Sequence, residues 1–131
     1  MKIIPVFAKD VNRKGCIKYP VGPAEFLGLF RDAKFVCTDS FHGMIFAIIF
    51  HVDFIEFERF AHKDPSNQNF RVYNIAELLS LEDRISRGKV EDDILMSAID
   101  FHEVDTKLDE LREDSLGWLK NALASIENRS H

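Results

Sequence analysis

The chain has 131 residues, of which 22 are acidic and 17 basic, and its formal net charge is -5. Hydrophobic residues make up 46%, which is enough for one globular domain with its own core. The acidic balance argues against a nucleic-acid binder, which would carry a basic patch. We therefore expect no nucleic-acid partner.

The first part of the chain alternates apolar runs with a helical pattern. Residues 3–7 form a short apolar run and predict a strand. The polar, glycine-containing segment 9–22 predicts a loop. A proline then opens a predicted helix over residues 23–34, and residues 35–37 predict a second, fully apolar strand.

The segment 41–50 is apolar almost all round, so periodicity alone does not separate a buried helix from a strand. It lies between the strand-like runs 35–37 and 53–57, and Gly43 and Ala47 permit close packing. We predict a buried helix, and hence two parallel strands joined by a right-handed crossover. The fold class expected is α/β, with a Rossmann-like parallel sheet flanked by helices.

The second half of the chain is more polar. An amphipathic helix is predicted over residues 72–79, and the charged segment 82–93 predicts a surface loop. Residues 104–128 predict a long C-terminal helix with one apolar stripe, on which Trp118 is expected to pack. We expect residues 1–131 to form a single α/β domain.

Two cysteines, Cys16 and Cys37, are too few for a disulfide scaffold. Cys37 lies in an apolar run and is predicted to be a small core residue. The longest apolar run outside the N-terminus, residues 44–50, is far shorter than the ~20 residues of a membrane span. We expect a reduced, cytoplasmic protein without a transmembrane segment.

The carboxyl ends of parallel strands are where open α/β sheets bind ligands. Three segments meet that edge here, residues 8–10, 38–43 and 58–63. They bring together the following polar side chains: Lys9, Asp10, Asp39, Ser40, His42, Glu58, Arg59, His62 and Lys63. Segment 38–43 also opens a helix, whose free N–H groups favour an anion, and Gly43 would let a ligand approach the backbone.

His42 is the strongest candidate for catalysis, because a histidine titrates near neutrality and sits here in a loop beside a glycine. The alternative is that it stabilises the start of the helix. Asp39 and Ser40 are predicted to cap that helix rather than to react. A serine hydrolase is excluded, since triad members converge from separate segments. The histidines and cysteines show no metal-ligand spacing, so we expect no metal.

Residues 23–27, 33–43, Phe46 and Phe54 resemble the C-terminal half of the polysaccharide pyruvyl transferase family. Residues 71–75 and 78–84, and Ser115 followed by Trp118 and Leu119, are similar to that family as well. The likeness is sharpest over residues 38–43. Family members are longer and resemble two-domain glycosyltransferases of the GT-B type. The resemblance implies that this chain is the donor-binding C-terminal domain, and a strand so near Met1 suggests a missing N-terminal domain.

The resemblance implies transfer of a pyruvyl group from phosphoenolpyruvate to two hydroxyls of a saccharide acceptor, as a ketal on a cell-surface polysaccharide or exopolysaccharide. It requires no cofactor. His42 would be the catalytic acid or a phosphate ligand. The substrate-binding residues implied are Asp39, Ser40, Phe41, Gly43, Arg59 and Arg71.

One departure from the family pattern concerns the phosphate. Many members carry arginine and leucine before the matching histidine, where this chain has Ser40 and Phe41. Arg59 and Arg71 are the candidates to supply the missing arginine fork. The departure leaves two alternatives: a GT-B-type glycosyltransferase domain using a nucleotide sugar, or a non-catalytic domain of the same fold. In either enzymatic case we expect this chain alone to be inactive.

Overall fold

The computed structural model describes residues 22–59 and 69–127. The strand predicted at residues 3–7 and Cys16 lie outside these ranges. The elements in chain order are α1 (Pro23–Arg31), β1 (Val36–Thr38), α2 (Phe41–Ile49), β2 (Phe54–Phe57), α3 (Asn69–Leu79), the 3₁₀ turn η1 (Glu82–Arg84), β3 (Ile85–Ser86), α4 (Asp92–Met96) and α5 (Phe101–Glu127).

The described strands form one parallel sheet in the order β1-β2-β3. Val36 pairs with Phe54 and Thr38 with Glu56, and on the other side of β2 Glu56 pairs with Ile85. The central strand β2 therefore has a neighbour on each side. The predicted unit of strand, buried helix and parallel strand is confirmed, and so is the α/β class.

Helix α2 is the centre of the core because its sequence is apolar on every side. Met44 and Ala47 are fully buried, and Ile48 is nearly so. On its outer side the rings of Phe26 and Phe30 in α1 lie 5.9 Å from the ring of Phe46. The phenylalanines of the first half thus join α1 to α2, since aromatic pairs at this spacing add to the area they bury.

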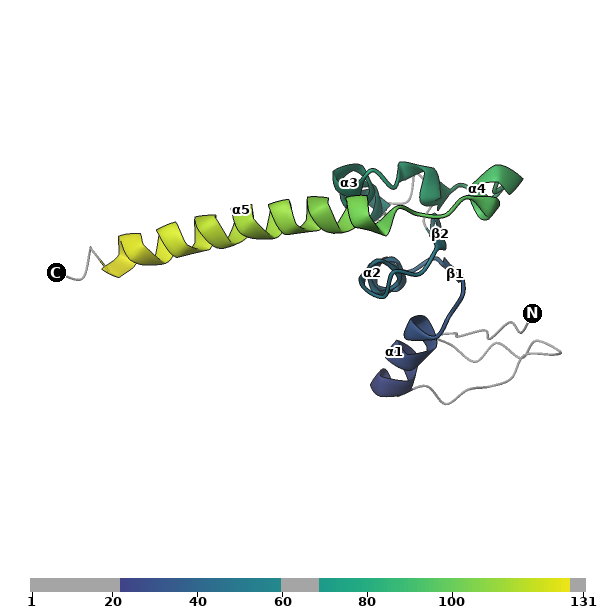
Figure 1. Cartoon of the computed structure of the whole chain (residues 1–131), viewed down its shortest axis with the longest axis horizontal. Helices are drawn as coiled ribbons and strands as arrows, with labels where there is room; N and C mark the ends of the chain where they lie inside the picture. The colour runs from purple at the N-terminus through teal and green to yellow at the C-terminus, as the bar shows by residue number, and fades with distance from the viewer. Residues whose placement is uncertain (1–21, 60–68, 128–131) are drawn as a thin grey trace.

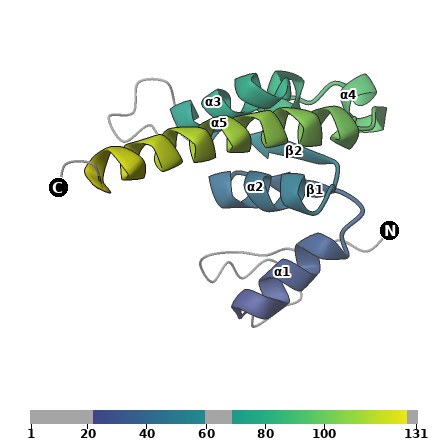
Figure 2. The same cartoon turned by 60° about the vertical axis from the view of Figure 1, so that its left-hand side comes forward.

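The helices form layers along one direction of the molecule. Figures 1 and 2 both show α1 at one end, then α2, and then α5 with α3 beyond it. Phe54 of β2, Val72 and Ala76 of α3, and Val104 of α5 belong to the same buried cluster as α2. One continuous core therefore holds the sheet between its helices.

Helix α5 has two halves with different surroundings. Val104 is buried, and Leu108 and Leu111 pack against the core. Beyond them the helix projects away from the other elements (Figure 1). Within residues 22–59 and 69–127, no helix combines the length and the apolar character needed to cross a bilayer.

The prediction that Trp118 packs on the apolar stripe of the last helix was wrong, because 72% of this residue is exposed. The stripe continues in sequence after the core has ended in space. Four neighbours on the distal half of α5 are also exposed: Leu116, Leu119, Leu123 and Ile126. A helical period in the sequence shows which face is apolar, but not whether anything covers it.

The segment 82–93 was predicted to be a charged surface loop, and this was wrong. It contains η1 and the strand β3, which extends the sheet. Arg84 is 3% exposed, and its guanidinium donates to the carbonyl oxygen of Ser97 at 3.1 Å and to that of Ile94 at 3.3 Å. Because backbone carbonyls accept from the buried guanidinium, a residue typical of a surface loop lies inside the fold.

Cys37 was predicted to be a core residue, and this too was wrong. Successive side chains of a strand face opposite sides of a sheet. Thr38 faces α2, where its Oγ1 lies close to Gly43, so Cys37 points to the other side and is exposed.

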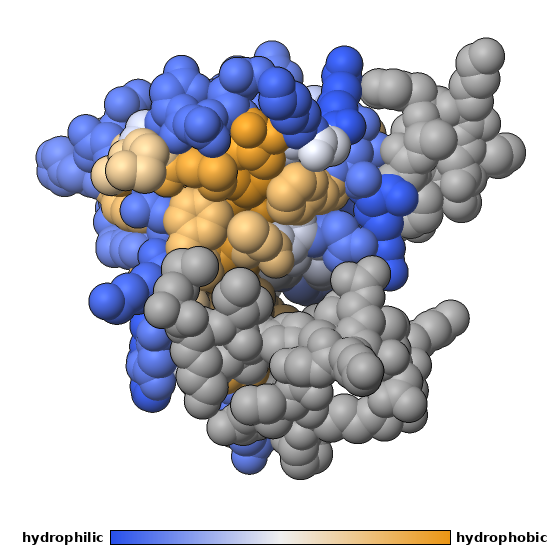
Figure 3. Space-filling model, turned by 90° about the vertical axis from the view of Figure 1, so that its right-hand side faces the viewer, coloured by the Kyte–Doolittle hydropathy of each residue, from blue (hydrophilic) through white to orange (hydrophobic). Residues whose placement is uncertain are grey.

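Seen from the end opposite the projecting half of α5, the surface shows an area of apolar residues within mostly hydrophilic surroundings (Figure 3).

Candidate functional site

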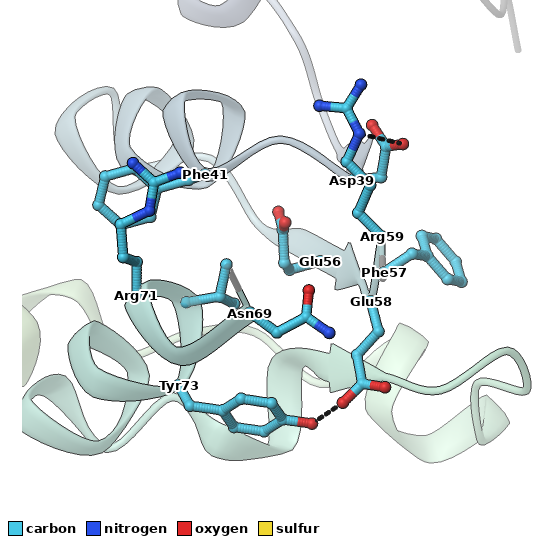
Figure 4. Close-up of a pocket in the computed structure, with 10 residues that line it drawn as sticks. Asp39, Phe41, Glu56, Phe57, Glu58, Arg59, Asn69, Arg71 and Tyr73 are labelled. Carbon is cyan, nitrogen blue, oxygen red and sulfur yellow. Dashed lines mark hydrogen bonds and ion pairs between the residues drawn. The ribbon is translucent and has the colours of Figure 1, made fainter. Parts of the chain in front are cut away.

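A pocket lies where β1 and β2 end and where α2 and the described part of α3 begin. It is lined by Asp39, Phe41, Glu56, Phe57, Glu58, Arg59, Asn69, Arg71, Val72 and Tyr73 (Figure 4). This is the edge of a parallel sheet at which α/β proteins bind ligands. The N-terminal turn of α2 lies beside it, and the N–H groups of a first helical turn favour an anion.

Glu56 forms the floor of the pocket. It lies on the central strand β2, paired with Thr38 on one side and Ile85 on the other, and is 1% exposed. Figure 4 shows its carboxyl group in the middle of the lining residues. Within the described ranges, Oε2 of this carboxyl has no hydrogen-bond partner.

The environment of Glu56 favours the neutral acid. Burial raises the pKa of its carboxyl to about 8, and the negative charge of Asp39 adds to the effect. Desolvation disfavours a carboxylate because the ionised form loses more hydration than the neutral one. At neutral pH Glu56 therefore carries a proton.

Two arginines border the pocket. Nε of Arg59 lies 3.9 Å from Oδ2 of Asp39, and both side chains are more than half exposed. Arg71, from α3, places its guanidinium carbon 5.2 Å from the centre of the Phe41 ring (Figure 4). The weak, exposed contact with Asp39 leaves Arg59 able to turn toward a ligand at little cost.

A third group of polar side chains closes the pocket at the β3 side. The Tyr73 hydroxyl donates to Oε1 of Glu58, and Nε of Arg87 donates to the same oxygen at 3.2 Å. Arg87 Nη2 also donates to the Tyr73 hydroxyl oxygen at 3.2 Å. Burial and the hydrogen bond to Glu58 raise the pKa of Tyr73. This network holds Glu58 as a paired carboxylate, unlike Glu56.

The loop between β1 and α2 is held by its own side chains. The backbone N–H of Ser40 donates to Oγ1 of Thr38 at 3.1 Å, and Ser40, at the N-cap position of α2, makes no side-chain capping bond. A Cβ added to Gly43 would lie 2.3 Å from that Oγ1. The close approach that Gly43 permits is thus to Thr38, and neither Gly43 nor Ser40 lines the pocket.

His42 lies in the first turn of α2 and is exposed. Its ring meets the ring of Phe41 edge-on, with centroids 5.9 Å apart. Phe41 lines the pocket, whereas His42 is not among the described lining residues. His42 is therefore a neighbour of the pocket that could reach a ligand extending over Phe41.

The pocket gathers some of the expected binding residues and omits others. Those in its lining are Asp39, Phe41, Arg59 and Arg71, together with Glu58 from the expected edge. Lys9, Asp10, His62 and Lys63 lie outside the described residues. Within the described ranges, no group of three or more potential ligand residues is placed to hold a metal ion.

Sequence reasoning missed Glu56, Asn69 and Tyr73 as pocket residues. For Glu56 a signal was present, because a carboxylate in the middle of a buried apolar strand lowers the stability of the fold and is therefore seldom found there without a functional role. Asn69 and Tyr73 gave no such signal. Both reach the pocket only because α3 begins beside the end of β2.

The comparisons with known proteins bear on the first part of the chain. The model of the family described as polysaccharide pyruvyl transferase matches residues 3–59, less than half of the chain. The match includes the loop at residues 38–43 and ends at Arg59, so it supports the resemblance inferred from the sequence over that segment. The likeness expected beyond residue 59 stays a prediction. Neither the curated proteins nor the solved structures gave a match.

Proposed function

We propose that this chain forms the donor-binding part of a polysaccharide pyruvyl transferase. The observation that carries the proposal is the family match, because residues 3–59 include the described pocket residues contributed by the ends of β1 and β2. The donor is phosphoenolpyruvate, and the acceptor is a pair of hydroxyls on one sugar of a polysaccharide. The product is a cyclic ketal of pyruvate.

This reaction sets clear requirements for the site. A proton is added to the methylene carbon of phosphoenolpyruvate, and one sugar hydroxyl attacks the neighbouring carbon. The bond from that carbon to the phosphate oxygen breaks, and the second hydroxyl takes its place. Of the two protons lost by the hydroxyls, the balance places one on carbon and one on phosphate. The site must therefore hold a phosphate and a carboxylate and manage protons.

The pocket offers groups suited to the two anionic ends of the donor. Arg59 and Arg71 border it, and a guanidinium matches a carboxylate or phosphate with two parallel hydrogen bonds. The first turn of α2 adds backbone N–H groups. We propose that Arg71 and Arg59 replace the arginine that many family members carry at the position of Ser40. Asp39 and Phe41 shape the same pocket.

His42 is proposed as the acid that serves the departing phosphate, or as a charged ligand of that phosphate. Its place in the first turn of α2 puts an imidazole beside the N–H groups that would hold the anion. Ser40 and Gly43 contribute backbone to the same turn. The acceptor site is proposed to lie on a further domain, so this chain alone is expected to bind the donor without transferring it. We place the reaction in the cytoplasm.

The proposal is tested by an amide chemical-shift titration of the chain with phosphoenolpyruvate, with inorganic phosphate as the control anion. Larger shifts with phosphoenolpyruvate at residues 39–43 and at Arg71 are expected, because the carboxylate adds a second contact. Equal shifts with both anions, or shifts outside the pocket, would contradict donor binding there.

Variants sharpen the same test. Arg71→Ala should weaken phosphoenolpyruvate binding about tenfold or more, as loss of a charge-assisted contact does. Arg112→Ala is the matched control, since Arg112 lies on α5 and pairs with Asp109 at 2.8 Å, away from the pocket. Equal affinities of the two variants for phosphoenolpyruvate would contradict the assignment of Arg71 to the donor site.

A further inference from the structure

We propose that Glu56 acts in the pocket as a neutral carboxylic acid that donates a hydrogen bond to the anionic donor, so that the pocket binds an anion together with one proton. The inference rests on the proposed function for the identity of the anion. It assigns a binding role to a residue that lies inside a strand rather than in the expected loop.

Glu56 is placed where a ligand in the pocket would meet it. Glu56 is 1% exposed and lines the pocket from its floor, and Oε2 lacks a hydrogen-bond partner among the residues described. A buried polar atom without a partner costs about 1–3 kcal/mol, so most buried polar atoms in folded proteins have one. A ligand in the pocket would supply the missing partner.

The charge of the pocket lining depends on whether Glu56 is ionised. Besides Glu56, the pocket is lined by two acidic residues, Asp39 and Glu58, and two basic residues, Arg59 and Arg71. An ionised Glu56 would give this lining a net negative charge and repel an anion, whereas the neutral acid leaves it balanced. Hydrogen bonding from a neutral buried acid to an anion is a known use of a carboxyl group in an apolar site.

Other titratable and charged groups lie around Glu56. Asp39 follows β1 and is exposed beside Arg59, so it is not enclosed in the pocket as Glu56 is. On the α3 and β3 side, the Glu58 carboxyl group already accepts hydrogen bonds from Tyr73 and Arg87. The remaining charged neighbours are Arg71 on α3 and His42 on α2, and neither is an acid. Among the described residues, Glu56 is thus the carboxyl group best placed to carry the proton.

The experiment measures the affinity of the chain for phosphoenolpyruvate by calorimetry at pH 7.5 and pH 9, in buffers with different heats of ionisation. A histidine with the ordinary pKa of about 6.5 is mostly neutral at both pH values. With a Glu56 pKa of about 8, the dissociation constant should rise about eightfold between them, with proton uptake at pH 9.

Glu56→Gln should bind with similar affinity at both pH values and without proton uptake, because the amide donates a hydrogen bond and does not ionise. Glu56→Ala should bind more weakly at both. Glu77→Gln is the matched control, an exposed acid on α3, and should retain the eightfold change. The proposal is overturned if Glu56→Gln keeps the pH dependence of the natural chain.

A measurement without ligand tests the protonation directly. The carboxyl carbon shift of Glu56, assigned by its loss in Glu56→Gln, should titrate near pH 8. Titration near the ordinary value of about 4.5 would overturn the proposal, whatever the binding measurements on the variants gave.

The two proposals fail in different ways. Proton-coupled binding of inorganic phosphate with no preference for phosphoenolpyruvate would overturn the donor assignment and keep the role of Glu56. Tight binding of phosphoenolpyruvate that does not depend on pH would do the reverse. Absence of binding for both anions would overturn both.

Discussion

The strand-end pocket and the distal half of α5 depart from ordinary burial in opposite directions. In the pocket the carboxyl group of Glu56 is buried, and one of its oxygens has no partner in the part of the chain that the structure describes, whereas on α5 large apolar side chains such as Trp118 and Leu123 are exposed. Burying an unpaired polar group costs a folded protein far more than exposing one apolar side chain.

The difference shows where an unusual residue carries information about function. An exposed leucine is common on protein surfaces, so the distal half of α5 does not by itself identify a partner. A buried acid is normally neutral, paired with a positive charge, or part of a functional site. Glu56 lies in a pocket bordered by two arginines, which favours a functional role on chemical grounds. The predictions below test this contrast, beginning with the largest expected effect.

The pocket should make stability depend on pH through Glu56. In the unfolded chain its pKa is ordinary, near 4.5, and in the folded chain it is about 8. Between these values the folded state holds the extra proton, so the free energy of unfolding falls as pH rises, by about 1.4 kcal/mol per pH unit. From pH 5 to pH 8, Glu56→Gln should therefore gain on the order of 4 kcal/mol relative to the natural chain.

Denaturant unfolding at several pH values measures that gain. Glu77→Gln, on the exposed side of α3, should follow the natural chain at every pH. If the difference in unfolding free energy between Glu56→Gln and the natural chain stayed constant with pH, Glu56 would ionise with an ordinary pKa. The pocket would then treat its carboxyl group as an exposed surface does.

Gly43→Ala should destabilise the pocket side of the molecule by about 2 kcal/mol, because the added Cβ would lie 2.3 Å from Oγ1 of Thr38. Gly28→Ala is the control within α1, where an added Cβ meets nothing within 4 Å. It should stabilise by up to about 1 kcal/mol through the higher helix propensity of alanine. Thermal unfolding distinguishes them, and equal effects would contradict the tight packing of the loop against α2.

The two halves of α5 should respond differently to truncation. Val104→Ala should cost about 2 kcal/mol, since Val104 is 2% exposed and its methyl groups fill the core. Leu123→Ala should change stability by less than about 0.5 kcal/mol, because Leu123 is 55% exposed. A large loss for Leu123→Ala would show that something covers the distal half in solution.

The smallest effect concerns the distal helix itself. Gly117→Ala should raise the local stability of α5 by up to about 1 kcal/mol, because nothing lies within 4 Å of the added Cβ. Hydrogen exchange of the amides around residue 117 should slow, while that of α2 stays the same. Slower exchange in both places would indicate that the distal half unfolds together with the core.

Several features of the molecule could be predicted from the amino-acid sequence. The apolar run at residues 41–50, placed between two strand-like runs, was enough to predict the buried helix α2 and the parallel pairing of β1 with β2. The carboxyl ends of those strands then gave the edge on which Asp39, Glu58 and Arg59 lie. These predictions depend on local patterns and on the handedness of chain connections, which hold without knowledge of long-range contacts.

Other features were decided only by tertiary structure. Arg84 is buried because the carbonyl groups of residues ten and thirteen positions further along the chain accept its hydrogen bonds. Trp118 is exposed because the core ends before the apolar stripe does. Glu56 became the centre of the pocket because α3 covers the end of β2. The physical reason is the same in each case: periodicity tells which side of an element is apolar, whereas burial and pKa depend on which distant groups fill the space beside it.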